Sequence, residues 1–243
     1  MDSASPPYLS VVVPVYNEEK KIAETVRRIS AFLTLKGEPC EILVVNDGSK
    51  DRTREVLETV SKESQGLPFK FIHSEINRGK GYASRQCILQ AKGRYILLTD
   101  ADLSAPIKEV DKLIHALQNG ADVAIGSRAV RENGCDVRQS LSRQVSGRIF
   151  NFFVQSLVLP GIYDSQCGFK CFTNEAAQKL FQAQRLDGFS FDVEVLYLAR
   201  KMDFRIAEVP VMWSQGPDSR VSLLRDSTRM IKDLFRIKKI HTN

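Results

Sequence analysis

One stretch decides how the fold of this chain is interpreted: Arg94-Tyr95-Ile96-Leu97-Leu98-Thr99-Asp100-Ala101-Asp102. Its apolar middle is typical of a buried β-strand, and two carboxylates stand one residue apart where that strand ends. Carboxylates that converge on one small volume repel each other, and a bound divalent cation relieves that repulsion. Because Asp-x-Asp also occurs in ordinary surface turns, the triplet alone indicates a metal and phosphate site only in outline.

Two earlier segments repeat the arrangement of an apolar strand that ends in acidic or polar residues. Residues 9–15 precede Tyr16-Asn17-Glu18, and residues 41–46 precede Asp47-Gly48-Ser49. Apolar residues also recur at helical spacing in three segments: Ile22, Val26, Ile29 and Leu33; Val56, Leu57 and Val60; Val110, Leu113, Ile114 and Leu117. This alternation predicts an α/β fold with a mostly parallel sheet covered by helices on both faces. Ligands of such sheets bind beyond the carboxyl ends of the strands, where all three acidic turns lie.

The motifs that are missing narrow the class of ligand. No G-x-G-x-x-G follows the first strand and no G-x-x-x-x-G-K-[ST] occurs, which argues against a dinucleotide site of the dehydrogenase type and against a P-loop. A diphosphate can still bind through a metal at Asp102, with Arg78 and Lys80 of the loop Asn77-Arg78-Gly79-Lys80-Gly81 supplying positive charge. The alternative is that this loop is a glycine-punctuated turn before a helix over about residues 82–91.

The composition is that of an ordinary soluble globular protein: 243 residues, 43% apolar and 26% charged. No run reaches the ~18 apolar residues that a membrane span needs, so we expect a cytoplasmic protein, with peripheral attachment to the cytoplasmic membrane face as an open alternative. Five cysteines without a C-x-x-C pair predict reduced thiols and no zinc site.

The positive charge is concentrated near the C-terminus. Residues 220–243 hold seven of the Lys and Arg residues against two Asp. Five of these cations would form one stripe of a helix: Arg225, Arg229, Lys232, Arg236 and Lys239. The stripe indicates either a membrane-surface helix or a terminal helix that is packed on the domain with a solvated basic face. No nucleic-acid partner is expected, because no binding motif or interleaved aromatic residues accompany the charge.

The chain turns basic again after Arg128. Residues 128–148 contain two acidic residues, Glu132 and Asp136, and five arginines: Arg128, Arg131, Arg138, Arg143 and Arg148. Arginines clustered beside a donor diphosphate favour a second anionic ligand. The apolar run over residues 149–159 that follows would suit an isoprenoid chain, a bilayer or the core of the domain.

Seven motifs resemble those of the family 2 glycosyltransferases of the GT-A fold, and within that family those of the polyprenyl-phosphate sugar transferases. They run in the family's order from about residue 9 to residue 213: Val13-Pro14-Val15-Tyr16-Asn17-Glu18-Glu19, Val45-Asn46-Asp47-Gly48-Ser49-x-Asp51, Asn77-x-Gly79-Lys80-Gly81, Asp100-Ala101-Asp102, Gly126-Ser127-Arg128, Gln166-Cys167-Gly168-Phe169-Lys170 and Phe191-Asp192-Val193-Glu194. The likeness is closer to the members that glucosylate dolichyl phosphate than to those that mannosylate it.

The resemblance implies a Rossmann-like GT-A fold in one compact domain and a role for each matching residue. The nucleoside would be held by Pro14, Tyr16, Glu18, Asp47 and Asp100. Asp102 would ligate Mg²⁺ or Mn²⁺ at the diphosphate. The acceptor phosphate would meet Arg128, Arg138, Ser142 and Arg143. We therefore divide the chain into a nucleotide-sugar half (1–128), an acceptor half (129–215) and a basic amphipathic C-terminal helix (216–243).

The implied reaction is an inverting transfer of a hexose, with glucose from UDP-glucose favoured, to a polyprenyl or dolichyl phosphate. A phosphomonoester is mostly dianionic at neutral pH and needs no base, whereas a sugar hydroxyl does. Family members that use a hydroxyl carry a Glu-Asp pair where this chain has Phe191-Asp192. Asp192 remains as a candidate base, so transfer to a glycan stays open, as do mannose transfer from GDP-mannose and a catalytically silent binding module.

Overall fold

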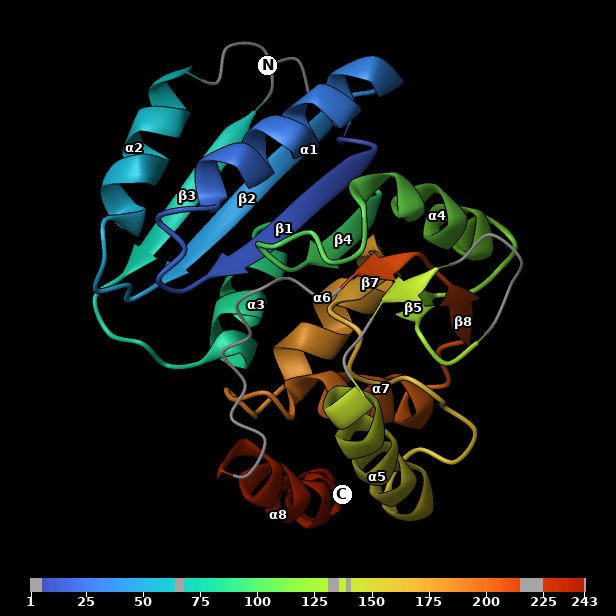
Figure 1. Cartoon of the computed structure of the whole chain (residues 1–243). Coiled ribbons are helices and arrows are strands. Elements are labelled where there is room, and N and C mark those ends of the chain that lie inside the picture. The colour runs from blue at the N-terminus through green and yellow to red at the C-terminus, as the bar shows by residue number, and fades with distance from the viewer. Residues whose placement is uncertain (1–5, 64–67, 131–135, 139–140, 215–224, 243) are drawn as a thin grey trace.

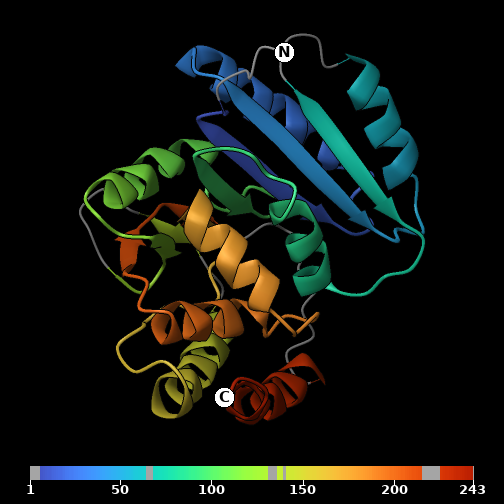
Figure 2. The ribbon, with the colours of Figure 1, turned by 180° about the vertical axis from the view of Figure 1, so that it is seen from behind.

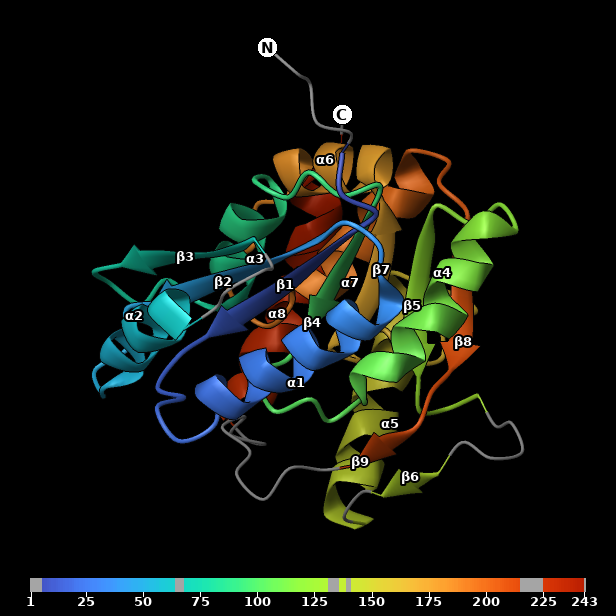
Figure 3. The ribbon, with the colours of Figure 1, turned by 90° about the horizontal axis from the view of Figure 1, so that it is seen from above.

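The computed structural model describes residues 6–63, 68–130, 136–138, 141–214 and 225–242. Of residues 138, 141–146 and 225–228 it describes the backbone alone. One seven-stranded sheet runs through the molecule in the order β3-β2-β1-β4-β7-β5-β8 (Figure 1). A small two-stranded sheet pairs β6 with β9 (Figure 3). The strands are β1 (Leu9–Val15), β2 (Cys40–Asp47), β3 (Phe69–Ser74), β4 (Tyr95–Thr99), β5 (Val123–Ser127), β6 (Val137–Arg138), β7 (Phe169–Thr173), β8 (Ile206–Pro210) and β9 (Trp213–Ser214).

Helices cover both faces of the large sheet, as the alternating sequence pattern predicts. They are α1 (Ile22–Lys36), α2 (Thr53–Glu63), α3 (Lys80–Ile88), α4 (Val110–Gln118), α5 (Leu141–Leu157), α6 (Asn174–Ala183), α7 (Phe191–Lys201) and α8 (Arg225–Ile240), with a 3₁₀ turn at Ile107–Glu109 before α4. Helices α1, α2 and α4 lie on one face, and α3, α6 and α7 lie on the other (Figures 1 and 2). Seen from above, the sheet separates these two layers (Figure 3).

Alternating side chains of the strands feed two cores, one on each side of the sheet. Val11 and Val13 join the apolar cluster under α1 and α4, whereas Val12 between them joins the cluster under α3, α6 and α7. The helical spacings noted in the sequence are confirmed, since Ile22, Val26, Ile29 and Leu33 of α1 are all buried. The same holds for the four apolar residues of α4. The helix expected over about residues 82–91 begins two residues earlier and ends at Ile88.

One strand of the second half enters the sheet of the first. Strands β3, β2, β1 and β4 pair in parallel, but β7 runs antiparallel between β4 and β5. Its first residue, Phe169, lies opposite Thr99 at the carboxyl end of β4. The segment that precedes β7 therefore reaches the Asp100 turn directly, and this places residues from both halves of the chain at one site.

Helices α5 and α8 lie at the end of the molecule opposite α1 and α2, and they pack against each other (Figure 1). Met230, Leu234 and Ile237 of α8 are buried in the same cluster as Phe150 and Val154 of α5. Among the helices of the described residues, none combines the length and the apolar character needed to cross a bilayer.

Candidate active site

The three acidic turns of the sequence lie at one edge of the sheet. Asp47 ends β2, Tyr16 follows β1, and Asp100 follows β4, and these three strands are parallel neighbours. Pro14, Tyr16 and Glu18 are half-buried there, while Asp102 is exposed. Helix α3 begins beside them with Lys80. The structure thus brings together the residues that the sequence proposed for a nucleotide sugar.

The Asp100-Ala101-Asp102 turn is fixed by hydrogen bonds before any ligand arrives. The Ala101 carbonyl accepts from the Thr25 hydroxyl at 2.5 Å, and the Asp100 carbonyl accepts from the Leu103 amide at 3.1 Å. Asp102 Oδ1 accepts from the Ser104 amide at 2.9 Å. This last bond orients an exposed carboxylate, which is the kind of hard oxygen ligand that a divalent cation takes.

The donor set at this turn suits a metal that is held jointly by protein and phosphate. Among the described residues no group of three or more His, Cys, Asp or Glu side chains converges as a metal cage. Mg²⁺ in nucleotide sites commonly has one or two protein carboxylates and completes its shell with phosphate oxygens and water. Asp102 and its neighbour Asp100 fit that mode of binding.

Lys80 and Asp100 form an ion pair at the mouth of the site. Their Nζ and Oδ1 atoms are 2.6 Å apart, and the side chains are 22% and 38% exposed. Burial works to lower the pKa of Lys80, but the carboxylates of Asp100, Asp192 and Asp102 outweigh it and hold this pKa above its usual value. Lys80 is therefore a permanent cation at neutral pH, and it stands beside the Asp100-Ala101-Asp102 turn.

Gly168 makes room for the Asp100 carboxylate. A Cβ atom at this position would lie 1.9 Å from Asp100 Oδ2, so only glycine leaves the carboxylate in its place. The Gln166-Cys167-Gly168-Phe169-Lys170 motif contained this residue, but the sequence alone gave it no role. The missing information was the antiparallel entry of β7 beside β4.

Asp192 lies in a second lysine–aspartate pair that is closed to solvent. Lys170 Nζ is 2.6 Å from Asp192 Oδ1 and also donates to the Cys167 carbonyl at 2.6 Å. The two side chains are 1% and 6% exposed. In this geometry Asp192 joins α7 to β7, and its carboxylate is also one of those that raise the pKa of Lys80.

Arg128 is also held by a carboxylate, that of Asp164, which belongs to none of the family motifs. Asp164 accepts from the backbone amide, Nε and Nη2 of Arg128 at 2.7 to 2.8 Å, and the guanidinium carbon lies 5.2 Å from the centre of the Trp213 ring. Burial works to raise the pKa of Asp164, but Arg128 outweighs it, and the pKa lies below its usual value of 3.8. This pair uses two of the five guanidinium N–H donors.

Asp47 holds the loop that leads into α3. Its carboxylate accepts from the Asn77 amide side chain at 3.0 Å and from the backbone amides of Arg78 and Gly79 at 3.0 and 2.7 Å. Burial raises the pKa of Asp47, and the two backbone N–H groups partly offset this. A nucleoside that contacted Asp47 would therefore meet a carboxylate that already positions the loop of Lys80.

The glycines of this loop serve close contacts within the protein. At Gly79, where φ is +116°, a Cβ would lie 2.4 Å from the Asp187 carbonyl oxygen, and at Gly81 it would lie 2.5 Å from that of Leu186. The Asp187 carbonyl also accepts from the amides of Gly81 and Tyr82. The backbone amides in the first turn of α3 are therefore bonded within the protein, and this loop can contact a ligand through the side chain of Lys80.

Three of the proposed acceptor residues lie outside what the structure describes in side-chain detail. These are Arg138, whose backbone belongs to β6, and Ser142 and Arg143, whose backbones belong to the first turn of α5. Their contacts with a phosphate stay a prediction.

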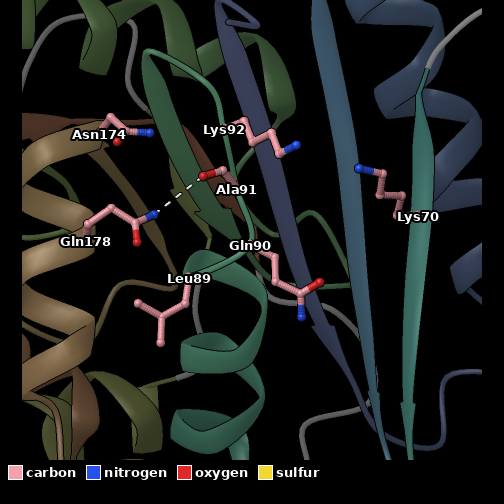
Figure 4. A pocket seen from close by; sticks show the side chains of 7 residues that line it. All are labelled: Lys70, Leu89, Gln90, Ala91, Lys92, Asn174 and Gln178. Carbon is pink, nitrogen blue, oxygen red and sulfur yellow. Dashed lines mark hydrogen bonds between the residues drawn. The ribbon is translucent and has the colours of Figure 1, made fainter.

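A hollow elsewhere on the molecule is unrelated to this site. It lies at the amino-terminal edge of the parallel strands and is lined by Lys70, Leu89, Gln90, Ala91, Lys92, Asn174 and Gln178 (Figure 4). Gln178 donates there to the Ala91 carbonyl, and Asn174 donates to that of Gly93, so both amides hold the segment before β4. The acidic turns are at the opposite edge of the sheet.

The sheet with its Asp-x-Asp turn defines a transferase of the GT-A class. The chain belongs to glycosyl transferase family 2, whose model matches residues 10–181. It is 34% identical to a dolichyl-phosphate beta-glucosyltransferase of Dictyostelium discoideum, over 95% of this chain and 74% of that protein. It is 38% identical to the enzyme of that name from Drosophila melanogaster, over 94% of this chain and 74% of that protein.

The solved structures confirm the fold. The glucosyl-3-phosphoglycerate synthase of Mycobacterium tuberculosis in complex with Mn²⁺ and UDP-glucose superimposes with a TM-score of 0.67, at 16% identity, over 96% of this chain and 79% of that one. This likeness confirms the predicted fold class, and the family model with the two relatives confirms the family and the assignment as a glycosyltransferase.

Proposed function

We propose that this protein transfers glucose from UDP-glucose to dolichyl phosphate or another polyprenyl phosphate, by a single displacement that inverts the anomeric centre. The observation that carries the proposal is the match, over nearly the whole chain, to enzymes named for β-glucosyl transfer to dolichyl phosphate. The site geometry adds an exposed carboxylate and a lysine at the point where a nucleoside diphosphate would leave.

On the donor side, the protein holds the nucleotide and compensates the charge of the leaving group. Pro14, Tyr16, Glu18, Asp47 and Asp100 would surround the nucleoside, as the family resemblance implies. Mg²⁺ or Mn²⁺ at Asp102 would neutralise charge that develops on the departing diphosphate. Lys80 is held as a cation beside this turn, and it would pair with the diphosphate oxygens in place of Asp100.

On the acceptor side, residues 129–215 would bind the lipid phosphate. Arg128 keeps three guanidinium N–H donors beyond the two that Asp164 takes, and the ion pair fixes the plane in which they point. Arg138, Ser142 and Arg143 would complete the phosphate site. The nucleophile is a phosphate dianion, so the burial of Asp192 against Lys170 is no obstacle to the reaction.

The decisive experiment offers the purified protein a matrix of donors and acceptors in detergent with Mn²⁺. UDP-glucose and GDP-mannose are each combined with a short polyprenyl phosphate, the matching polyprenol and a soluble glycan. Product is counted in the organic phase for the two lipids and in the aqueous phase, after removal of the free donor, for the glycan. The proposal expects product from UDP-glucose with polyprenyl phosphate and none with polyprenol. Transfer to the glycan hydroxyl, with none to polyprenyl phosphate, would overturn it.

We further propose that α5 and α8 present the acceptor site to a membrane surface. On α5 the side chains of Ile149, Phe152 and Phe153 are exposed, and Phe235 of the adjacent α8 is 62% exposed. Exposed cations of α8 surround that residue: Arg229, Lys232, Arg236, Lys238 and Lys239. Apolar side chains flanked by cations suit an anionic bilayer surface, at about 1 kcal/mol for each cation near the headgroups.

Vesicle sedimentation tests the membrane proposal independently of activity. We expect the protein to sediment with vesicles that contain anionic lipid and to dissociate as salt is raised. Replacing Phe152 and Phe235 together by Ser should weaken binding to the same vesicles. Equal recovery with neutral and anionic vesicles would contradict the role of the basic face.

A further inference from the structure

A fully buried carboxylate in α7 has no place in the donor and acceptor chemistry described above. Glu194 is 0% exposed and its two oxygens accept from the backbone amides of Arg185 and Leu186, each at 2.8 Å. His241, just past the end of α8, places Nε2 2.7 Å from Glu194 Oε1. A buried carboxylate is unfavourable by several kcal/mol unless it is paired and hydrogen-bonded, and these three contacts supply that compensation.

The segment that Glu194 holds packs directly against the start of α3. The Asp187 carbonyl accepts from the amides of Gly81 and Tyr82 at 2.8 and 3.2 Å. The Gln184 side-chain amide bridges the same two segments, donating to the carbonyls of Gly81 and Leu186 at 3.0 and 2.8 Å. Because no Cβ fits at Gly79 or Gly81, the two backbones are in contact and a shift of one moves the other.

Lys80 stands between these contacts. It is the first residue of α3, and its ammonium group is 2.6 Å from Asp100. The position of Lys80 therefore depends on the backbone at residues 185–187. Glu194 holds that backbone, and His241 is hydrogen-bonded to Glu194. A second contact ties α8 to the same region, because the Ser190 hydroxyl donates to Asp233 at 2.8 Å.

We propose that His241 is a positioning residue for the donor site: through Glu194 and the 185–187 backbone it sets where Lys80 stands relative to Asp100. This inference rests on the proposed function, since the group that Lys80 would meet is a donor diphosphate. His241 thereby contributes to donor binding from a distance, through Glu194. The sequence carried no sign of this, because His241 and Glu194 are 47 positions apart.

Binding of UDP in the presence of Mn²⁺, measured by calorimetry, tests the proposal without a lipid acceptor. His241→Ala should weaken UDP binding by about 10- to 100-fold, the range typical of residues that orient a ligand group. His241→Gln keeps an N–H donor near the place of Nε2 and should restore most of the affinity. Thr242→Val is the matched control, because it removes the neighbouring hydroxyl, which donates to the Lys238 carbonyl, and should bind UDP as wild type does.

Amide hydrogen exchange of the folded variants tests whether His241 affects the backbone at residues 185–187 and at the start of α3. Peptides that cover residues 79–82 and 184–188 should exchange faster in His241→Ala than in wild type, and Thr242→Val should leave them unchanged. Unchanged UDP affinity in His241→Ala, or faster exchange of the whole molecule without selective change in these two segments, would overturn the proposal. Wild-type protein that binds no UDP would instead refute the proposed function, so the two failures are distinguishable.

Discussion

Two lysine–aspartate pairs lie at the carboxyl edge of the sheet, and they differ in solvent access rather than in geometry. Lys80–Asp100 and Lys170–Asp192 both have a nitrogen–oxygen distance of 2.6 Å. The side chains of the first pair are 22% and 38% exposed, and those of the second are 1% and 6% exposed. The exposed pair can exchange partners with an incoming anion or cation, whereas the buried pair can only be broken at a large cost in stability. In our proposal exposure, and not residue type, separates the pair that serves the ligand from the pair that serves the fold.

The largest expected effect is at Asp102, on the exposed side of this comparison. Asp102→Asn replaces a charged ligand by a neutral amide, so charge on the leaving diphosphate is left uncompensated. We expect glucose transfer to fall on the order of 10³-fold, the equivalent of several kcal/mol of lost transition-state stabilisation, with an unchanged melting temperature. Initial rates with Mn²⁺ and thermal unfolding check this. Wild-type activity that survives complete chelation of divalent metal would show that the assignment of Asp102 to a metal is wrong.

The buried pair should show the opposite pattern. Asp192→Asn removes the carboxylate that is paired with the buried Lys170 ammonium, and we expect a loss of about 3–5 kcal/mol in the free energy of unfolding. Turnover per folded molecule should stay within about tenfold of wild type if the nucleophile is a phosphate, because lost general-base catalysis would reduce it by ~10²–10⁴-fold. Urea unfolding and rates on the folded fraction separate the two quantities.

A double substitution provides the control for the buried pair. Lys170→Met with Asp192→Leu removes both charges and keeps apolar volume, so it should recover most of the stability lost in Asp192→Asn. A stable Asp192→Asn protein that has nevertheless lost activity would support transfer to a hydroxyl and count against our proposed acceptor.

The sequence predicts the sheet and the position of its acidic turns, but it does not predict which charged residues pair. The apolar strands and the spacing of the helices were sufficient to predict the parallel sheet and to place Asp47, Asp100 and Asp102 at one edge, because strand direction fixes which ends meet. The sequence could not show that Asp192 is paired with Lys170, or that Asp164 is paired with Arg128. Both pairings depend on β7 entering the sheet in the antiparallel direction, and no local pattern encodes that choice.

Gly168→Ala should disturb the Lys80–Asp100 pair through a steric clash. The added methyl would lie 1.9 Å from Asp100 Oδ2, so the carboxylate must move and Lys80 loses its partner. A displacement of about 1 Å at a reacting site typically reduces rate on the order of 10²-fold, and we expect that loss in kcat/KM for UDP-glucose. Gly147→Ala is the matched control, because nothing lies within 4 Å of its Cβ position. Equal kinetics of the two variants would mean that Asp100 need not occupy its present place.

The smallest expected effect concerns the Arg128–Asp164 pair and its dependence on pH. The folded-state pKa of Asp164 lies below 3.8, so the pair stabilises the protein fully above about that pH and loses its contribution only as the pH falls through the lower folded value. In Arg128→Gln the burial of Asp164 loses its largest compensation and keeps only the backbone amide of residue 128 and the charge of Lys170, so we expect its folded pKa to rise above the unfolded one. The variant is then destabilised at neutral pH and regains stability as Asp164 is protonated.

The gap between wild type and variant in the free energy of unfolding should therefore narrow from about pH 7 to about pH 4.5, by about 1.4 kcal/mol for each pH unit below the raised pKa. Urea unfolding at a series of pH values measures the gap. The control is the double variant Arg128→Gln with Asp164→Asn, which has no carboxylate at position 164. Its difference from wild type in the free energy of unfolding should not change over this pH range. If the gap for Arg128→Gln alone also stays constant with pH, Asp164 does not titrate in the variant and the carboxylate has found another partner.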